Sequence, residues 1–182
     1  MVTLEHINRK FLRLITFFAE KSAERKGSQM LADCFSEDTI IFLDPKDRDE
    51  ALFLLAEKIA QGSLHLSTKK IHDAVIDREK IVSTGIGGGV ALPHAKLEGI
   101  EEFALGLAIC QSEGVEWNAL DGQLVKFIFM IVGPSNQPKA YLKMLSSLTS
   151  LLKQQRFLDQ LFLLRDSSKI LHLISQFESL ST

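Results

Sequence analysis

The sequence predicts a layered α/β domain with an extra N-terminal helix. Short runs rich in β-branched and aromatic residues alternate with longer segments whose apolar residues recur at helical spacing, and this alternation is typical of α/β domains. The chain has 182 residues, of which 46% are hydrophobic, so it can form one substantial core plus an extension. We therefore divide it into an N-terminal amphipathic extension, residues 1–30, and a single domain, residues 31–182.

The N-terminal extension differs from the rest in charge and pattern. Residues 1–26 carry six basic against three acidic side chains, and apolar residues recur at helical spacing at Leu4, Ile7, Phe11, Leu14, Ile15 and Phe18. The favoured interpretation is a helix packed on the domain or on a partner subunit, which leaves a homodimer open. A basic helix that touches a membrane is the less favoured alternative, and a disordered leader is the third. Arg13 interrupts the apolar stretch and no small-residue cleavage site follows, which argues against a signal peptide.

The first half of the domain is expected to form a strand followed by two helices. Residues 39–43 are apolar and β-branched, which favours a short buried strand. Residues 47–61 carry one apolar stripe and are followed by Gly62, a typical helix stop. Ser67 or Thr68 could cap the next helix, which is expected to continue to about residue 78.

The second half is expected to contain the central strands and the last helices. A glycine-rich turn leads into a short strand at 90–92, and two apolar segments, 102–111 and 125–132, have the composition of central strands. A turn at 118–123 would join these two strands. Three helices are then predicted, at 138–153, 157–164 and 168–177.

The segment Ser83–Ala95 holds the strongest functional signal. Its glycines would let backbone N–H groups approach an anion, and Pro93 fixes the backbone before His94, the side chain best suited to being neutral and nucleophilic near pH 7. A Walker-type loop is excluded because no Gly-Lys-Ser/Thr follows the glycines. The glycine spacing also fails the dinucleotide fingerprint. A phosphate-accepting histidine and a loop with a structural histidine remain.

Three short motifs narrow this choice: Arg78-Glu79, then Ser83-Thr84-Gly85-Ile86-Gly87, then Ala91-Leu92-Pro93-His94. Together they resemble the phosphorylation site of the fructose/mannitol/nitrogen-type enzyme IIA domains of the bacterial phosphotransferase system. The resemblance covers roughly residues 31–177. This sequence has no sugar-transporter segment, so it is most similar to the nitrogen-regulatory, PtsN-like branch. The resemblance implies a mixed β-sheet with helices on both sides.

The resemblance also implies roles for individual residues. His94 would be the catalytic phosphoryl acceptor, with the Arg78 guanidinium beside it as a fork for phosphate oxygens. Ser83 and Thr84 could donate hydroxyl hydrogen bonds to phosphate, although turn capping is an equal explanation for both. Tyr141 stands where many members carry a second histidine. It could hydrogen-bond a phosphate oxygen, but with a reference pKa of about 10 it could not carry a positive charge there.

The function that the resemblance implies is a phosphocarrier that works through a phosphohistidine. His94 would be phosphorylated by the HPr-type phosphocarrier protein, with phosphoenolpyruvate as the ultimate donor, and a regulatory role with an unidentified target is favoured. One alternative is a binding module independent of phosphate. Another is a sugar-specific enzyme IIA that serves a separate permease. Whether the protein is an enzyme in the strict sense is left open.

The composition argues against several kinds of site and partner. A net charge of −2 does not indicate a general surface for binding nucleic acid. The two cysteines form no CxxC pair and the histidines lack ligand spacing, so neither a disulfide framework nor a metal site is expected. No cofactor is expected, and the cytoplasm is the simplest compartment.

Overall fold

The computed structural model describes residues 31–62, 66–119 and 121–179, so the predicted extension at 1–30 lies outside the described residues. The described residues divide into two compact units, one of residues 34–136 and one of residues 31–33 with 137–179. The first unit contains a 3₁₀ turn η2, helices α2 and α3 and every strand of the described residues: η2 Glu37–Thr39, β1 Ile40–Leu43, α2 Arg48–Gly62, α3 Thr68–Ile81, β2 Gly85–Gly87, β3 Val90–Ala91, β4 His94–Leu97, β5 Ala104–Cys110 and β6 Phe127–Pro134.

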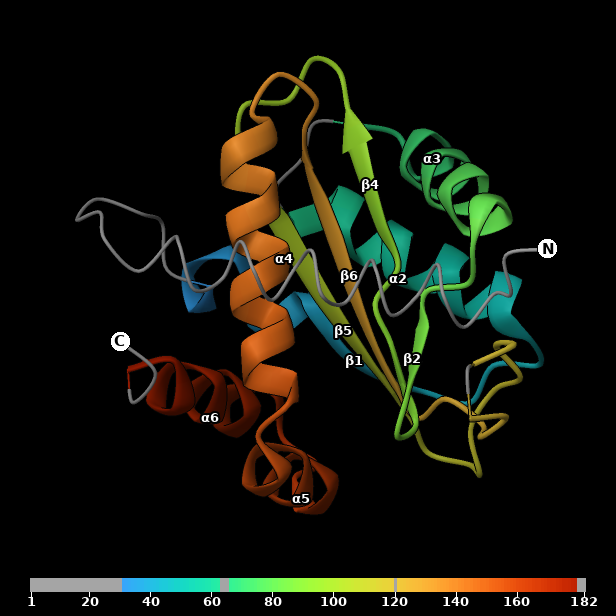
Figure 1. Cartoon of the computed structure of the whole chain (residues 1–182), viewed down its shortest axis with the longest axis vertical. Helices are drawn as coiled ribbons and strands as arrows, with labels where there is room; N and C mark the ends of the chain where they lie inside the picture. Colours follow the sequence, from blue (N-terminus) through green and yellow to red (C-terminus); the bar gives the residue numbers. More distant parts are fainter. Residues whose placement is uncertain (1–30, 63–65, 120, 180–182) are drawn as a thin grey trace, which may run out of the picture. The chain divides into compact units, whose positions relative to one another are not determined.

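The six strands form one mixed sheet (Figure 1). Its order is β1-β5-β6-β3-β2, and β4 also pairs with β6. The central pair, β5 and β6, is antiparallel, whereas β1 runs parallel to β5, and β3 and β4 run parallel to β6. Every residue of β5 and β6 is buried, as their nearly continuous apolar sequences predict. The predicted mixed α/β fold is therefore confirmed.

Strands β3 and β4 lie one after the other along the same edge of β6. Val90 pairs with Phe127 and His94 pairs with Ile131, so the register offset is the same on both sides of the break. Proline has no N–H to donate to a sheet, but the Pro93 carbonyl still accepts a hydrogen bond from the Ile131 N–H at 3.0 Å. The proline therefore interrupts the strand without shifting it, and His94 stands where the strand resumes.

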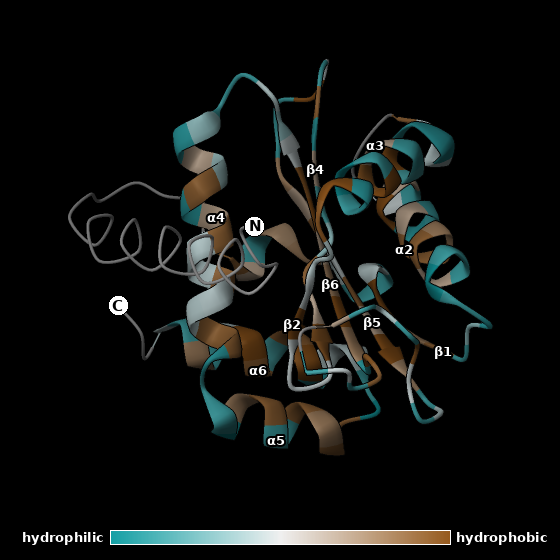
Figure 2. Cartoon of the chain, turned by 45° about the vertical axis from the view of Figure 1, so that its right-hand side comes forward, coloured by the Kyte–Doolittle hydropathy of each residue, from teal (hydrophilic) through white to brown (hydrophobic). Residues whose placement is uncertain are grey.

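Helices α2 and α3 pack side by side and contact the sheet through β5 and β4 respectively (Figure 1). The predicted stripe on α2 is fully buried, at Ala51, Leu52, Leu55, Ala56 and Ile59. Gly106 in β5 makes this close packing possible, because a Cβ there would lie 2.8 Å from Leu55 Cδ1 and 3.0 Å from Ile59 Cδ1. In Figure 2 the central strands are largely hydrophobic, while both helices also carry hydrophilic residues. The Ser67 hydroxyl caps α3 by accepting from the Lys70 N–H, as predicted.

The glycine-rich segment was predicted to be a turn, and this was partly wrong. Gly85–Gly87 forms strand β2, which pairs antiparallel with β3, and the turn is confined to Gly88 and Gly89. Gly87, Gly88 and Gly89 have φ values of 91°, 64° and 72°, a left-handed conformation that glycine adopts without steric cost. Strand β4 was not predicted either, because four residues of mixed polarity, His-Ala-Lys-Leu, give no clear pattern.

Among its described residues, the second unit contains the helices α4 Pro138–Leu152, α5 Gln155–Leu163 and α6 Ser167–Ser179, and the short turn η1 Ala32–Cys34 begins in this unit and ends at the first residue of the other. All three helices were predicted to within about two residues at each end. Pro138 occupies the first turn of α4, a position where its missing N–H costs nothing. Phe157 and Phe177 join α5 and α6 by an edge-to-face contact with ring centroids 5.5 Å apart. The Glu178 carboxylate accepts from the backbone N–H groups of Leu31 and Ala32.

Candidate functional site

The His94 ring is held at both nitrogens. Nδ1 lies 2.8 Å from the Leu92 carbonyl oxygen, and Nε2 lies 3.1 Å from Nε of Arg78. A carbonyl can only accept and a guanidinium can only donate, so Nδ1 must carry the proton and Nε2 must present its lone pair. Two independent contacts therefore select the same neutral tautomer, whose nucleophilic atom is Nε2.

The environment also keeps the ring uncharged. His94 is only 7% exposed, and burial lowers the pKa of its imidazole to about 4. The Leu92 hydrogen bond opposes this shift, while the positive charges of Arg78 and Lys96 add to it. At pH 7 the imidazole is therefore neutral and available as a nucleophile.

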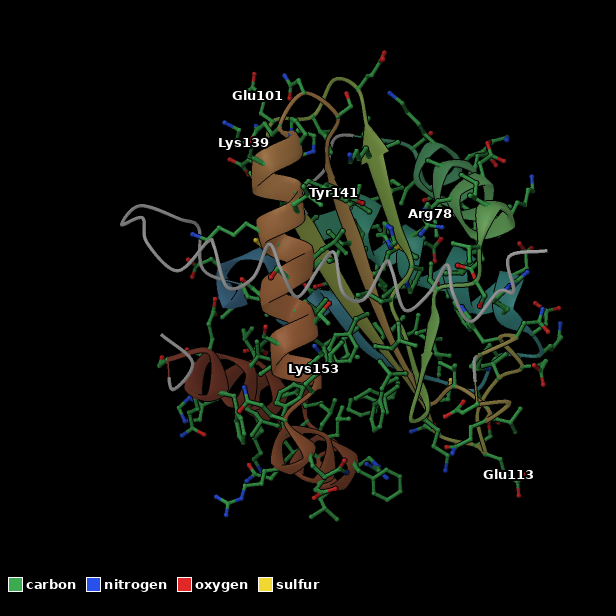
Figure 3. The ribbon with its side chains drawn as sticks, in the orientation of Figure 1. Arg78, Glu101, Glu113, Lys139, Tyr141 and Lys153 are labelled. Carbon is green, nitrogen blue, oxygen red and sulfur yellow. The ribbon has the colours of Figure 1, made fainter. Side chains whose placement is uncertain are left out.

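Arg78 extends from the last turn of α3 toward the start of β4 (Figure 3). Its Nη1 donates to the Val82 carbonyl at 3.1 Å, which fixes the guanidinium while Nε reaches His94. A planar guanidinium beside a nucleophilic nitrogen is well placed for the oxygens of an incoming phosphoryl group. The structure thus brings together the two residues that the sequence separates by 16 positions.

Ser83 and Thr84 are directed elsewhere. The Ser83 hydroxyl donates to the Trp117 carbonyl at 2.8 Å, and the Thr84 hydroxyl lies 2.5 Å from Glu79 Oε2. Both hydrogen bonds fix the loop after α3, which matches the turn-capping alternative. A contribution of either hydroxyl to phosphate stabilisation stays a prediction.

Glu79 is a site residue that sequence reasoning did not assign. Its side chain is 1% exposed, its Oε1 lies 3.6 Å from Arg48 Nη1, and it accepts two hydrogen bonds from Thr84. The only signal in the sequence was its place next to Arg78 in the motif. Its partners Arg48 and Thr84 come from a different helix and a following loop, so no spacing rule could reveal them.

The glycine turn does not serve as an anion site for His94. The Gly88 N–H donates to the Asp121 carboxylate at 2.8 Å, and this bond, with one from the Gln123 N–H, lowers the pKa of Asp121. Four residues of extended chain lie between Gly89 and His94, so the two residues are five steps, or roughly 16 Å, apart. The expectation that these glycines approach an anion is therefore met by Gly88, whose anionic partner is a carboxylate of the same chain and not a group at His94.

Tyr141 lies in the second unit, in the first turns of α4, and is 2% exposed. Its role toward His94 stays a prediction. Within the described parts of the chain, no group of three or more histidine, cysteine or acidic side chains is arranged to hold a metal ion. Across the same residues, every helix is too short or too polar to cross a membrane.

Residues 33–177 match the model of a known family, described as phosphoenolpyruvate-dependent sugar phosphotransferase system, EIIA 2. The chain belongs to this family. The match includes His94, Arg78 and Glu79 together with the whole sheet, and it agrees with the boundaries of the resemblance noted in the sequence.

The chain is also similar to individual curated proteins and to a solved structure. A nitrogen regulatory protein of Klebsiella oxytoca is 36% identical over 101 residues, which are 56% of this chain and 62% of that protein. A nitrogen regulatory protein of Bradyrhizobium diazoefficiens is 30% identical over 128 residues, 70% of this chain and 82% of that protein. The crystal structure of nitrogen regulatory protein IIA-Ntr from Neisseria meningitidis superposes with a TM-score of 0.73 at 22% identity, covering 79% of this chain and 98% of that one. The match to the Klebsiella protein thus spans less than two thirds of its length.

Proposed function

We propose that this EIIA-type protein accepts a phosphoryl group on Nε2 of His94 from an HPr-type phosphocarrier and acts as a regulatory, nitrogen-type component of the phosphotransferase system in the cytoplasm. The single observation that carries the proposal is the double hydrogen bonding of His94, which leaves the Nε2 lone pair as the only nucleophile of a neutral ring. The similarity to nitrogen regulatory proteins supports the regulatory part.

In the proposed step the Nε2 lone pair attacks the phosphorus of the donor's phosphohistidine. A new N–P bond forms, the donor's N–P bond breaks, and its electron pair stays on the donor nitrogen. Nδ1 keeps its proton, and the Leu92 carbonyl stabilises the positive charge that the ring gains. Arg78 gives up its bond to Nε2 and donates to the phosphoryl oxygens instead, so its charge balances the transferred group.

Phosphorylation would then change what the surface can bind. A phosphoryl group adds about 1.5 to 2 negative charges beside Arg78, enough to recruit one partner and repel another. Tyr141 in place of a second histidine would alter the transfer rate or the lifetime of the phosphohistidine, because its ring cannot become cationic near neutral pH.

The test is phosphorylation in a purified system. The protein is incubated with phosphoenolpyruvate, enzyme I and HPr, and its intact mass is measured alongside that of His94→Ala. The expected result is a gain of one phosphate that the variant lacks. If HPr becomes phosphorylated while the wild-type protein does not, the relay function is wrong and the phosphate-independent binding module is favoured instead.

A further inference from the structure

The hydrogen bonds of Glu79 go to Thr84 and its ion pair goes to Arg48, yet both contacts that orient the His94 ring depend on the loop that Glu79 holds. We propose that Glu79 is a positioning residue: acting through Thr84, it keeps Leu92 and Arg78 where they select the Nδ1–H tautomer of His94. The inference deepens the proposed function and rests on it for its catalytic consequence, whereas the tautomer itself can be measured without any phosphoryl donor.

The first step is the orientation of the Thr84 hydroxyl. Trp117 Nε1 lies 3.3 Å from Thr84 Oγ1 and, as an indole nitrogen, can only donate. The hydroxyl proton must therefore point to Glu79 Oε2, 2.5 Å away, while the Thr84 backbone N–H donates to Oε1 at 3.0 Å. Both carboxylate oxygens act as acceptors, and the guanidinium of Arg48 lies beside Oε1. This arrangement suits an ionised carboxylate and fixes Thr84 at its backbone and its side chain.

The second step runs from Thr84 to the histidine. The Thr84 carbonyl accepts from the Leu92 N–H at 3.0 Å, and the Leu92 carbonyl in turn accepts from His94 Nδ1 at 2.8 Å. A displaced Thr84 would therefore shift the acceptor that holds the Nδ1 proton.

The third step concerns the other side of the ring. The Val82 carbonyl holds Nη1 of Arg78, whose Nε contacts His94 Nε2. Val82 lies two residues before Thr84 and Arg78 directly precedes Glu79, so the same carboxylate fixes the loop that holds the guanidinium. Both constraints on the tautomer thus lead back to one buried acidic group.

A purely structural role would give different results from a positioning role. If Glu79 only stabilised the fold, its replacement would lower the free energy of unfolding, and the molecules that remained folded would keep an unchanged His94. A positioning role instead predicts a changed His94 in folded protein. The two can be separated by measurements on the folded, unphosphorylated full chain.

The experiment uses Glu79→Gln and Thr84→Val with ¹⁵N-labelled histidine. Glutamine keeps the shape but replaces one acceptor oxygen with a donor, and valine removes the hydroxyl while leaving the backbone N–H. The ¹⁵N spectrum of the wild type should show Nδ1 protonated and Nε2 bare, and both variants should show a mixture of tautomers. We expect phosphorylation by HPr to slow by roughly 10- to 100-fold, the scale on which small misplacements of a reacting group act.

Matched controls and a rescue complete the design. Asp121→Asn removes a carboxylate that holds the Gly88 turn, at the end of β3 remote from His94, and Thr149→Val removes a buried hydroxyl bonded to the Leu145 carbonyl within α4. Neither control should change the His94 spectrum, and Thr84→Ser should retain the wild-type tautomer.

A pure Nδ1–H spectrum in folded Glu79→Gln or Thr84→Val would overturn the proposal. If the variants change the tautomer but the wild type takes no phosphate from HPr, the proposed function fails while the positioning role stands.

Discussion

At His94, geometry and burial lead to the same chemical state. The Leu92 carbonyl and the Arg78 guanidinium each require a neutral Nδ1–H imidazole, and burial of the ring disfavours the charged form. The state needed for nucleophilic attack is therefore built into the folded protein before any donor arrives.

The low pKa of His94 has a consequence for stability. Its folded-state pKa is about 4 against an ordinary value of 6.5, so between these pH values the unfolded chain binds a proton that the folded chain excludes. The free energy of unfolding is therefore unaffected by this group above pH 6.5. It decreases as the pH falls from 6.5 toward 4, by about 3 kcal/mol in total. Urea unfolding of the wild type and of His94→Gln across this range measures it. An equally steep pH dependence in His94→Gln would contradict the assignment to His94.

Arg78→Lys keeps the positive charge but removes the planar fork. Lysine cannot contact the Val82 carbonyl and His94 in the same geometry, so we expect HPr-driven phosphorylation to slow by roughly 10- to 100-fold, the equivalent of one or two charge-assisted hydrogen bonds. The rate is measured by intact mass over time. Arg165→Lys is the matched control, because this exposed guanidinium contacts the Phe162 and Leu164 carbonyls and the Phe162 ring, and it should leave the rate unchanged.

Tyr141→His restores the residue type that many family members carry. An imidazole at this position can be cationic near neutral pH, so we expect a changed rate of phosphorylation or a changed rate of phosphohistidine hydrolysis. Both rates are followed by intact mass after the donor is added or removed. Two rates equal to those of the wild type would show that the tyrosine is no determinant of the relay.

At the level of elements, α2 can pack closely against β5 because Gly106 in β5 has no side chain. Gly106→Ala places a Cβ 2.8 Å from Leu55 Cδ1, and we expect this overpacking to lower the free energy of unfolding by about 1–3 kcal/mol. Urea denaturation measures the loss. Gly62→Ala, at the end of the same helix, is the control, because its Cβ would meet Thr39 Cγ2 at an ordinary 3.5 Å and should cost little. An equal loss in both variants would refute the close-packing argument.

Elements with a long apolar pattern could be predicted from the sequence, and short ones could not. The stripe on α2 and the apolar runs of β5 and β6 depend on local periodicity and composition, and they were predicted nearly to their ends. Strand β2 has the sequence Gly-Ile-Gly, whose two glycines disfavour a strand, and it exists because β3 lies beside it. In the same way, the contact of Thr84 with Trp117 spans 33 residues, beyond the reach of any local rule.

For the whole molecule, the proposed modification changes the net charge by a large fraction. The chain has a net charge of −2, and the proposed step adds about one further negative charge, because the phosphoryl group brings about two and the ring, which keeps its Nδ1 proton, gains one positive charge. We expect the phosphorylated protein to elute later from an anion exchanger at pH 8, and His94→Ala treated in the same way to keep its elution position. A phosphate gain in the mass spectrum of His94→Ala would place the modification on another residue.

The family to which the chain belongs could be predicted because its motifs lie within a short stretch of sequence. The motif residues Arg78, Glu79, Pro93 and His94 fall within 17 positions. In the fold Arg78 contacts Nε2 of His94, and Glu79 holds the loop that follows α3. The role of Glu79 was not visible, because a buried acidic residue is recognised only when its partners are known. The motif residues that identify the family therefore include His94 and Arg78, but the motif alone does not reveal what Glu79 does at the His94 site.

The unbroken register across Pro93 fixes the length of one stretch of chain. Side chains alternate between the two faces of a strand, so inserting or deleting one residue between Val90 and His94 would exchange the faces of His94 and Ala95 while β6 stayed in place. The glycine turn at the other end of β3 has no such restriction. We expect relatives to tolerate insertions at the turn but to keep a constant count of residues from Val90 to Leu97, so that distance along the chain is itself a signature of the site.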